Sequence, residues 1–188
     1  MCAKRPRAIL PPMTRRQALW ASGLASLALF AVLAVLDQTM RDAGGPGIVG
    51  FELAASEEDA AEIVNAWGDR GEDAARASLY LDFPYLIAYG AFLTLAVAAV
   101  RDRVAGCGLR RLAAVGLAAI VLPAAGASFD AIEDVGLLIA LDGKGGDAAP
   151  LLAAICAILK FALIAASIVY LVVGWIAARR CEFSPNAS

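Results

Sequence analysis

Four long apolar segments dominate the hydrophobicity pattern of the chain. They cover residues 18–36, 79–100, 112–141 and 151–178. At about 1.5 Å per helical residue, each segment is long enough to cross about 30 Å of hydrocarbon. The pattern predicts an all-α membrane protein, a bundle of four transmembrane helices. The polar segment 37–78 is then expected to form a small extracytoplasmic helical lid over one end.

The bulk composition agrees with a membrane protein. Hydrophobic residues make up 61% of the chain, charged residues 18%, and the mean hydropathy is +0.71. A soluble domain carries about 25% charged residues, so a soluble fold is excluded. The chain contains no histidine, which removes the usual near-neutral base and the commonest transition-metal ligand. We therefore expect neither haem nor zinc, whereas a divalent cation is left open.

Basic residues are concentrated on one side of the predicted membrane. Eleven of the 16 occur in residues 1–17, between the second and third spans, and in the tail 179–188, whereas the segment 37–78 is acidic despite Arg41, Arg70 and Arg76. The positive-inside rule then predicts a multi-pass protein of the plasma (inner) membrane with both termini cytoplasmic. Cys2, Cys107 and Cys181 fall on the same side, so we expect free thiols there.

Ionisable residues of the four spans fall at one depth when the spans are counted as antiparallel neighbours. Asp82 is level with Asp130, and Lys160 lies opposite the stretch from Asp130 to Glu133. Counting outward along the first span places Asp37 at the same height. The predicted layer at the outer edge of the hydrocarbon contains five carboxylates and one lysine: Asp37, Asp82, Asp130, Glu133, Asp134 and Lys160.

The third span carries three of these carboxylates on one helical face, because Asp130, Glu133 and Asp134 are spaced at i, i+3 and i+4. They cannot all stay ionised without compensation from a proton, from Lys160 or from a bound cation. Charges within apolar helices usually face an interior or a wet cavity. The alternatives are a water-exposed acidic patch and a Lys160 side chain that reaches the interface alone.

The second span combines Asp82 with Tyr85 and Tyr89 on one face, and Pro84 lies between them. We interpret this face as part of the same site, with the tyrosines orienting a substrate. The alternative is that Asp82 only caps a helix that restarts at Phe83. In the third span, Pro123 and Gly126 predict a bend just below Asp130, and the alternative is that they only adjust helix packing.

The chain also resembles a group of uncharacterised bacterial four-helix membrane proteins. The resemblance extends from Phe51 onward, and its main motifs are the D-F-P-Y sequence at Asp82, the D-x-x-E-[ND] pattern at Asp130 and the Lys160-Phe161 pair. It supports the topology and the position of the site but implies no activity. Asn is expected more often at position 134 in that group, which implies that the charge of Asp134 is dispensable.

Three kinds of function fit these observations. The first is an intramembrane acid–base enzyme acting on a lipid or isoprenoid, with Asp82, Asp130, Glu133 and Lys160 as catalytic groups. Tyr85, Tyr89, Asp134 and Asp37 would then bind the substrate. The second is a small binding or transport protein coupled to a cation or proton, and the third is a structural or accessory membrane subunit. The expected partners are membrane lipids or a hydrophobic small molecule and not nucleic acid, and a homo-oligomer is left open.

Overall fold

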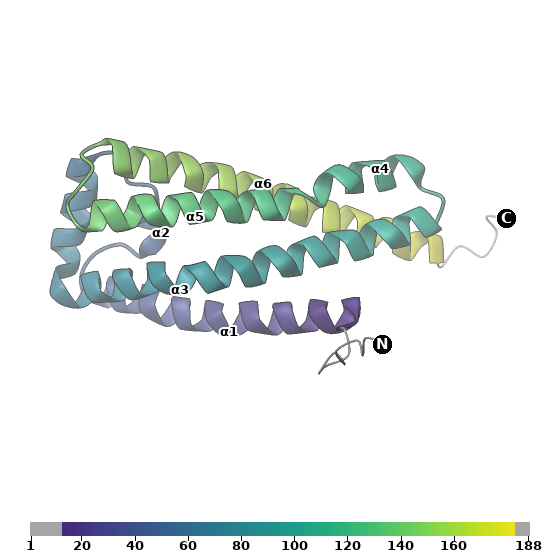
Figure 1. The fold of residues 1–188 in the computed structure, drawn as a ribbon, viewed down its shortest axis with the longest axis horizontal. Coiled ribbons are helices and arrows are strands. Elements are labelled where there is room, and N and C mark those ends of the chain that lie inside the picture. The colour runs from purple at the N-terminus through teal and green to yellow at the C-terminus, as the bar shows by residue number, and fades with distance from the viewer. Residues whose placement is uncertain (1–12, 183–188) are drawn as a thin grey trace, which may run out of the picture.

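The computed structural model describes residues 13–182, and all regular secondary structure in this range is helical (Figure 1). The elements are α1 (Arg15–Asp42), α2 (Ile48–Glu52), α3 (Glu57–Gly106), α4 (Arg110–Ala119), α5 (Leu122–Leu141) and α6 (Ala148–Glu182). Four helical stretches are long and apolar enough to span a membrane, with α4 and α5 together forming the third. The predicted all-α four-span bundle is therefore confirmed.

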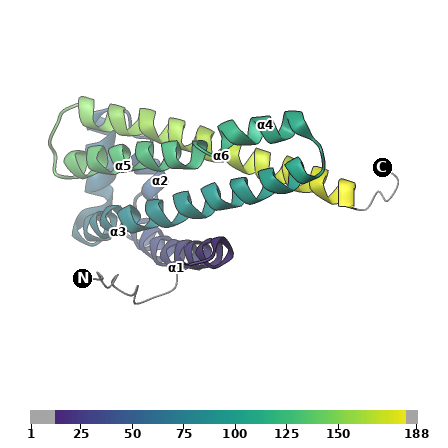
Figure 2. The same ribbon diagram turned by 45° about the vertical axis from the view of Figure 1, so that its right-hand side comes forward.

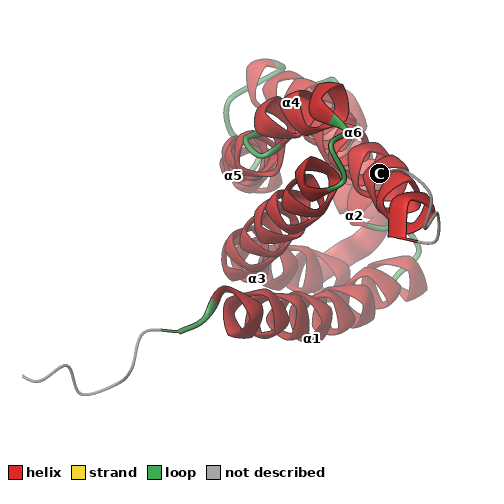
Figure 3. Ribbon diagram, turned by 90° about the vertical axis from the view of Figure 1, so that its right-hand side faces the viewer, coloured by secondary structure: helices red, strands yellow, loops and turns green. Residues whose placement is uncertain are grey.

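The first span, α1, is attached to the bundle along one side. Its start is fixed by a capping box, in which Thr14 and Gln17 satisfy each other's backbone N–H groups. It packs along α3, and most of its large apolar side chains stay exposed, as expected for a helix that faces lipid. Figure 3 shows α1 at the edge of the bundle, beneath α3.

The third span is divided into two helices. The break falls at Ile120 and Val121, and Pro123 lies in the first turn of α5. Proline has no N–H and its ring crowds the preceding turn, which favours a break between α4 and α5 at this point. The predicted bend is present, but Gly126 lies inside α5 against α6 and contributes close packing instead. Figure 2 shows α5 and α6 running side by side from their short loop.

The lid, residues 37–78, is built on the protein's largest buried cluster. Ser56 caps the start of α3, and Gly68 interrupts that helix with φ +55°, a conformation that favours glycine. The residues before Gly68 run across one end of the bundle (Figure 1). Trp67 is fully buried there, with its Nε1 donating to the Pro46 carbonyl at 2.7 Å and its ring 5.1 Å from that of Phe51.

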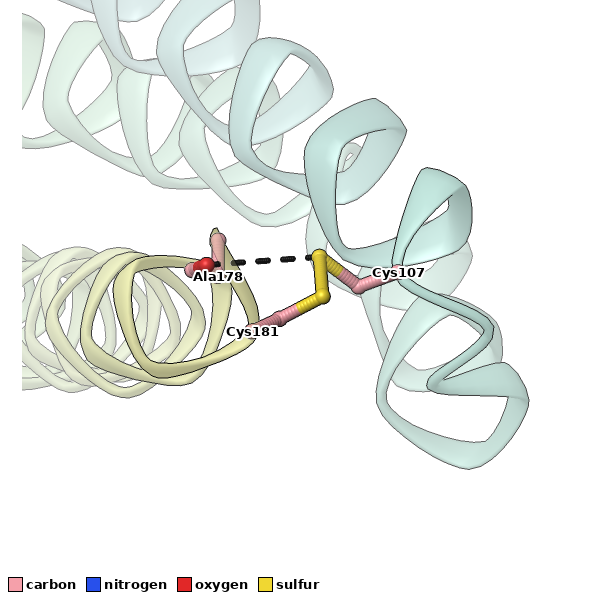
Figure 4. Close-up of a disulfide and its surroundings, with 3 residues drawn as sticks. All are labelled: Cys107, Ala178 and Cys181. Atoms are coloured by element: carbon pink, nitrogen blue, oxygen red, sulfur yellow. Dashed lines mark hydrogen bonds between the residues drawn. A yellow bond between two sulfur atoms is a disulfide. The ribbon is translucent and has the colours of Figure 1, made fainter. Parts of the chain in front are cut away.

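The opposite end of the bundle contains a disulfide between Cys107 and Cys181 (Figure 4). It joins the end of α3 to the last turn of α6 across 6.1 Å between Cα atoms. Our expectation of free thiols was wrong for these two residues, because the sequence does not reveal that these helix ends meet. Cys156 is free and buried within α6, and Cys2 lies outside the described residues.

Candidate functional site

Lys160 is buried at the centre of a carboxylate cluster. Its side chain is 7% exposed, and its Nζ donates to Asp130 Oδ1 at 2.7 Å and to Glu133 Oε1 at 2.8 Å. The predicted opposition of Lys160 to the stretch from Asp130 to Glu133 is therefore confirmed. A lysine held this way by α5 does not reach the interface alone, so the alternative of an unpaired, snorkelling side chain is wrong.

The structure adds Glu52 to this cluster, a residue that the sequence analysis did not identify. Glu52 ends α2, is 9% exposed, and places its Oε2 3.6 Å from Lys160 Nζ. That distance allows an ion pair but not a hydrogen bond. The signal in the sequence was a single glutamate between apolar Phe51 and Leu53. Burial raises the pKa of the Glu52 carboxyl above its ordinary value, and the positive charge of Lys160 opposes that rise.

A second group of carboxylates lies beside the lysine. Asp82, Asp130 and Asp134 each offer an oxygen, and these oxygens lie within 4.8 Å of one another. The predicted alignment of Asp82 with Asp130 is therefore confirmed. Within residues 13–182, no lysine or arginine forms an ion pair with Asp82 or Asp134. The single positive charge serves Glu52, Asp130 and Glu133, and leaves these two aspartates without a cation.

The helix α3 continues through Pro84, so the alternative that Asp82 caps a restarted helix is wrong. Asp82 is therefore presented from within a helix, one turn from Tyr85 and two from Tyr89. Tyr89 donates its hydroxyl to Asp130 Oδ2 at 2.7 Å. Its ring centroid lies 5.2 Å from that of Tyr85, which in turn is 6.4 Å from the ring of Phe30 on α1.

These side chains line a large cavity of about 670 Å³ between α1, α2, α3, α5 and α6. Most of its lining side chains are apolar. Five ionisable groups of the cluster line it: Glu52, Asp82, Asp130, Asp134 and Lys160. Glu133 does not line the cavity and is fully buried behind Lys160.

Asp37 lies at the cavity but not in the cluster's hydrogen-bond network. Its Oδ1 accepts the backbone N–H of Ile48 at 2.7 Å, and its Oδ2 accepts from Arg41 Nε at 2.8 Å. The first contact satisfies an N–H group at the start of α2, which otherwise has no side-chain cap. Asp37 thus positions the helix that carries Glu52.

Among the predicted site residues, the structure brings Asp82, Asp130, Glu133, Asp134, Lys160 and Tyr89 together, with Tyr85 beside them at the cavity wall. Comparison with protein-family models, with curated proteins and with solved structures gave no match. A functional assignment for this chain therefore has to rest on the cavity and the chemistry of the groups that line it.

Proposed function

We propose that the protein is an intramembrane enzyme that binds one lipid or isoprenoid molecule in the cavity and acts on its polar head by acid–base chemistry. The observation that carries this proposal is the polarity of the cavity along its length. The lining of α1 extends from Gly23 to Asp37, which is about 21 Å of helix at 1.5 Å per residue. The acidic and basic side chains that line the cavity, however, all lie at its lid end.

An amphipathic molecule matches that distribution. Leu27 and Phe30 of α1 and Ile164 and Ile168 of α6 are among the residues that line the apolar part, which suits a hydrocarbon chain. At the lid end, Tyr89 and Lys160 supply donors beside the cavity, and Asp82 and Asp134 supply acceptors that no lysine or arginine of residues 13–182 pairs with. Groups of both kinds beside one cavity are what general acid–base catalysis requires.

The test is a lipid-extract profile of a strain that lacks the protein. The enzyme predicts an accumulated precursor and a missing product, both restored by the wild-type chain. Asp82→Asn should fail to restore them, whereas Asp73→Asn should succeed, because Asp73 is an exposed residue of the same helix outside the cavity. An unchanged lipid profile in the deletion strain would contradict the enzyme and favour an accessory subunit.

The cavity itself is tested by filling it. Ile164→Trp should block substrate binding, because the larger side chain occupies the apolar part of the cavity. Ile158→Trp is the matched control, since Ile158 is 60% exposed on the same helix and does not line the cavity. Equal complementation by both variants would show that no chain occupies this space.

A cation- or proton-coupled binding or transport function is the second candidate. It is favoured by the two aspartates that lack a cationic partner. Within residues 13–182, however, the cavity lining contains no acidic or basic side chain toward the opposite end, so a charged substrate would meet an apolar path beyond the cluster. Proteoliposomes with an imposed cation gradient separate the two functions, because only the transporter predicts flux.

We also propose that both termini are cytoplasmic and that the lid is external, in the plasma (inner) membrane. A cysteine at Gly71 would crowd Trp67, since a Cβ there would lie 2.5 Å from Trp67 Cβ, so exposed Asp69 is the better labelling position. In a background without native cysteines, Asp69→Cys should react with an impermeant thiol reagent in intact cells. Labelling of a cysteine at Arg179 instead would reverse the orientation.

A further inference from the structure

We infer that Asp82, Asp130 and Asp134 form a site for a divalent cation with oxygen ligands, and that this cation holds the phosphate of a lipid-like ligand in the cavity. The cation site stands on its own geometry. Only the head group of the ligand rests on the proposed function.

The geometry of the three carboxylates fits such an ion. Ligand oxygens on opposite sides of a cation are separated by about 4.2 Å for Mg²⁺ and about 4.8 Å for Ca²⁺, twice the usual metal–oxygen distances. One oxygen from each of Asp82, Asp130 and Asp134 lies within 4.8 Å of the other two. Carboxylate oxygens are donors that suit hard cations such as Mg²⁺, Ca²⁺ and Mn²⁺.

Asp134 supplies an independent observation. It is only 2% exposed, and its Oδ2 is buried with no hydrogen-bond partner. An ionised carboxylate in that state is costly unless it is paired or bound to a metal. Asp134 also lines the cavity together with Asp82 and Asp130. The carboxylate without a hydrogen-bond partner therefore borders a space that is large enough for a ligand.

The remaining charges explain why Lys160 does not already fill this role. Its ammonium is directed to Glu133 and Asp130, with Glu52 at 3.6 Å. Asp130 is therefore shared: its Oδ1 accepts from Lys160 and its Oδ2 from Tyr89, and each oxygen keeps a second lone pair. The lysine neutralises the side of the cluster near α2, and the cation would neutralise the side formed by Asp82 and Asp134.

A cation held by three side chains keeps free coordination positions toward the cavity. Phosphate oxygens are its preferred additional ligands. Without the cation, the same carboxylates would repel an anionic head group, so binding of a lipid phosphate should depend on the metal. A lipid with a cationic head would show the opposite dependence, because the metal would compete with it.

The test uses the full chain in phosphatidylcholine nanodiscs, with Mn²⁺ as a paramagnetic probe. Titration followed by the electron paramagnetic resonance signal of free Mn²⁺ should give one site per chain. Affinity should fall at least tenfold in Asp82→Asn and in Asp134→Leu, and Asp73→Asn should bind as the wild type does. Equal binding by all four proteins would place the ion on other acidic groups and overturn the site, as would a wild type that binds no Mn²⁺.

Folding of the variants is checked without metal. Asp134→Leu removes an unpaired buried carboxylate, so its thermal unfolding temperature should equal or exceed that of the wild type. If Asp134→Leu does not fold, the cation site is tested with Asp82→Asn alone. Asp82 is half-buried, and asparagine has nearly the same shape as aspartate, so this variant should fold. A folded Asp82→Asn with unaltered Mn²⁺ affinity overturns the proposal.

The head group is tested with two single-chain amphiphiles. Dodecyl phosphate should raise the thermal unfolding temperature only when Mn²⁺ is present, and Ile164→Trp should abolish that rise. Stabilisation by dodecyltrimethylammonium without metal would overturn the phosphate assignment while supporting the lipid cavity. If neither amphiphile stabilises a protein that binds Mn²⁺, the cation site survives and the proposed lipid function fails.

Discussion

The two ends of the bundle are stabilised by different means. At the lid end, Trp67, Phe51 and Met40 form the centre of a large apolar cluster beside buried charges. At the other end, the apolar clusters are small and a disulfide ties Cys107 to Cys181. Charge is concentrated at both ends, but within residues 13–182 the charged residues that are buried as a whole, Glu52, Asp130, Glu133, Asp134 and Lys160, all belong to the cluster at the lid end.

The lid end contains the candidate functional site, whereas at the other end a disulfide holds two helices together. Buried charges keep a fixed geometry only where the surrounding packing holds them, and the lid supplies that packing from above. At the opposite end, the cross-link holds α3 and α6 together without a large core. The cluster should therefore tolerate changes at the disulfide, whereas small changes near Lys160 should affect the whole protein.

The largest expected effect comes from Lys160→Met. Removing one partner of a buried ion pair typically costs about 3–5 kcal/mol, because the opposite charges remain buried and uncompensated. Here Asp130 and Glu133 would lose a donor at 2.7 and 2.8 Å. Unfolding in detergent, followed by circular dichroism, should report this loss.

Two further variants make that measurement specific. Glu133→Gln in the Lys160→Met background should restore part of the stability, because one uncompensated charge is removed. Lys144→Met is the control: Lys144 is 72% exposed, and a surface ion pair is worth about 0–1 kcal/mol. Strictly additive losses in the double variant would show that Lys160 and Glu133 do not depend on each other.

The disulfide should have the next largest effect on stability. Loss of a disulfide typically costs about 2–4 kcal/mol, and this one closes a loop across a sequence separation of 74 residues. Cys107→Ser should therefore lower the free energy of unfolding but leave Mn²⁺ affinity at the lid end unchanged. Cys156→Ala, which touches no disulfide, is the control. A parallel loss of Mn²⁺ affinity in Cys107→Ser would show that the two ends are coupled.

The position of the disulfide also bears on orientation. Disulfides persist mainly in oxidising compartments, whereas the arginines beside this one predict a cytoplasmic end. The two arguments oppose each other, and labelling of Asp69→Cys decides between them.

The sequence was sufficient for the parts of the site that follow from helical periodicity. Hydrophobic length predicted four spans, and counting along antiparallel helices placed Asp82, Asp130 and Lys160 at one depth. Glu52 was missed because it comes from a five-residue helix whose packing against α6 depends on the lid. The Cys107–Cys181 pairing was missed for the same reason: the meeting of two helix ends is a tertiary contact with no local signal.

A smaller effect is expected from Glu52, through pH. Its carboxyl pKa is raised in the folded protein by burial, so folding favours the protonated form. The wild type should therefore lose stability as pH rises above the ordinary value of 4.5. Glu52→Gln lacks this titration and should gain stability relative to the wild type as pH rises above 4.5. A difference independent of pH would show that Glu52 stays ionised beside Lys160.

The smallest effect is expected at the exposed edge of the same lid end, where Arg76 pairs with Asp142 at 2.8 Å. Arg76 and Lys144 hold the pKa of the Asp142 carboxyl below its usual value. A lowered pKa stabilises the folded state above the ordinary value of 3.8, and that contribution disappears as pH falls through the folded-state pKa. Asp142→Asn should thus be slightly less stable than the wild type at pH 7 and equal to it at pH 2.

Because water and salt screen this pair, the difference at pH 7 should shrink in 1 M NaCl, whereas the loss in Lys160→Met should persist. Equal salt sensitivity of the two variants would mean that Lys160 is as hydrated as Arg76, contrary to its burial in the cluster.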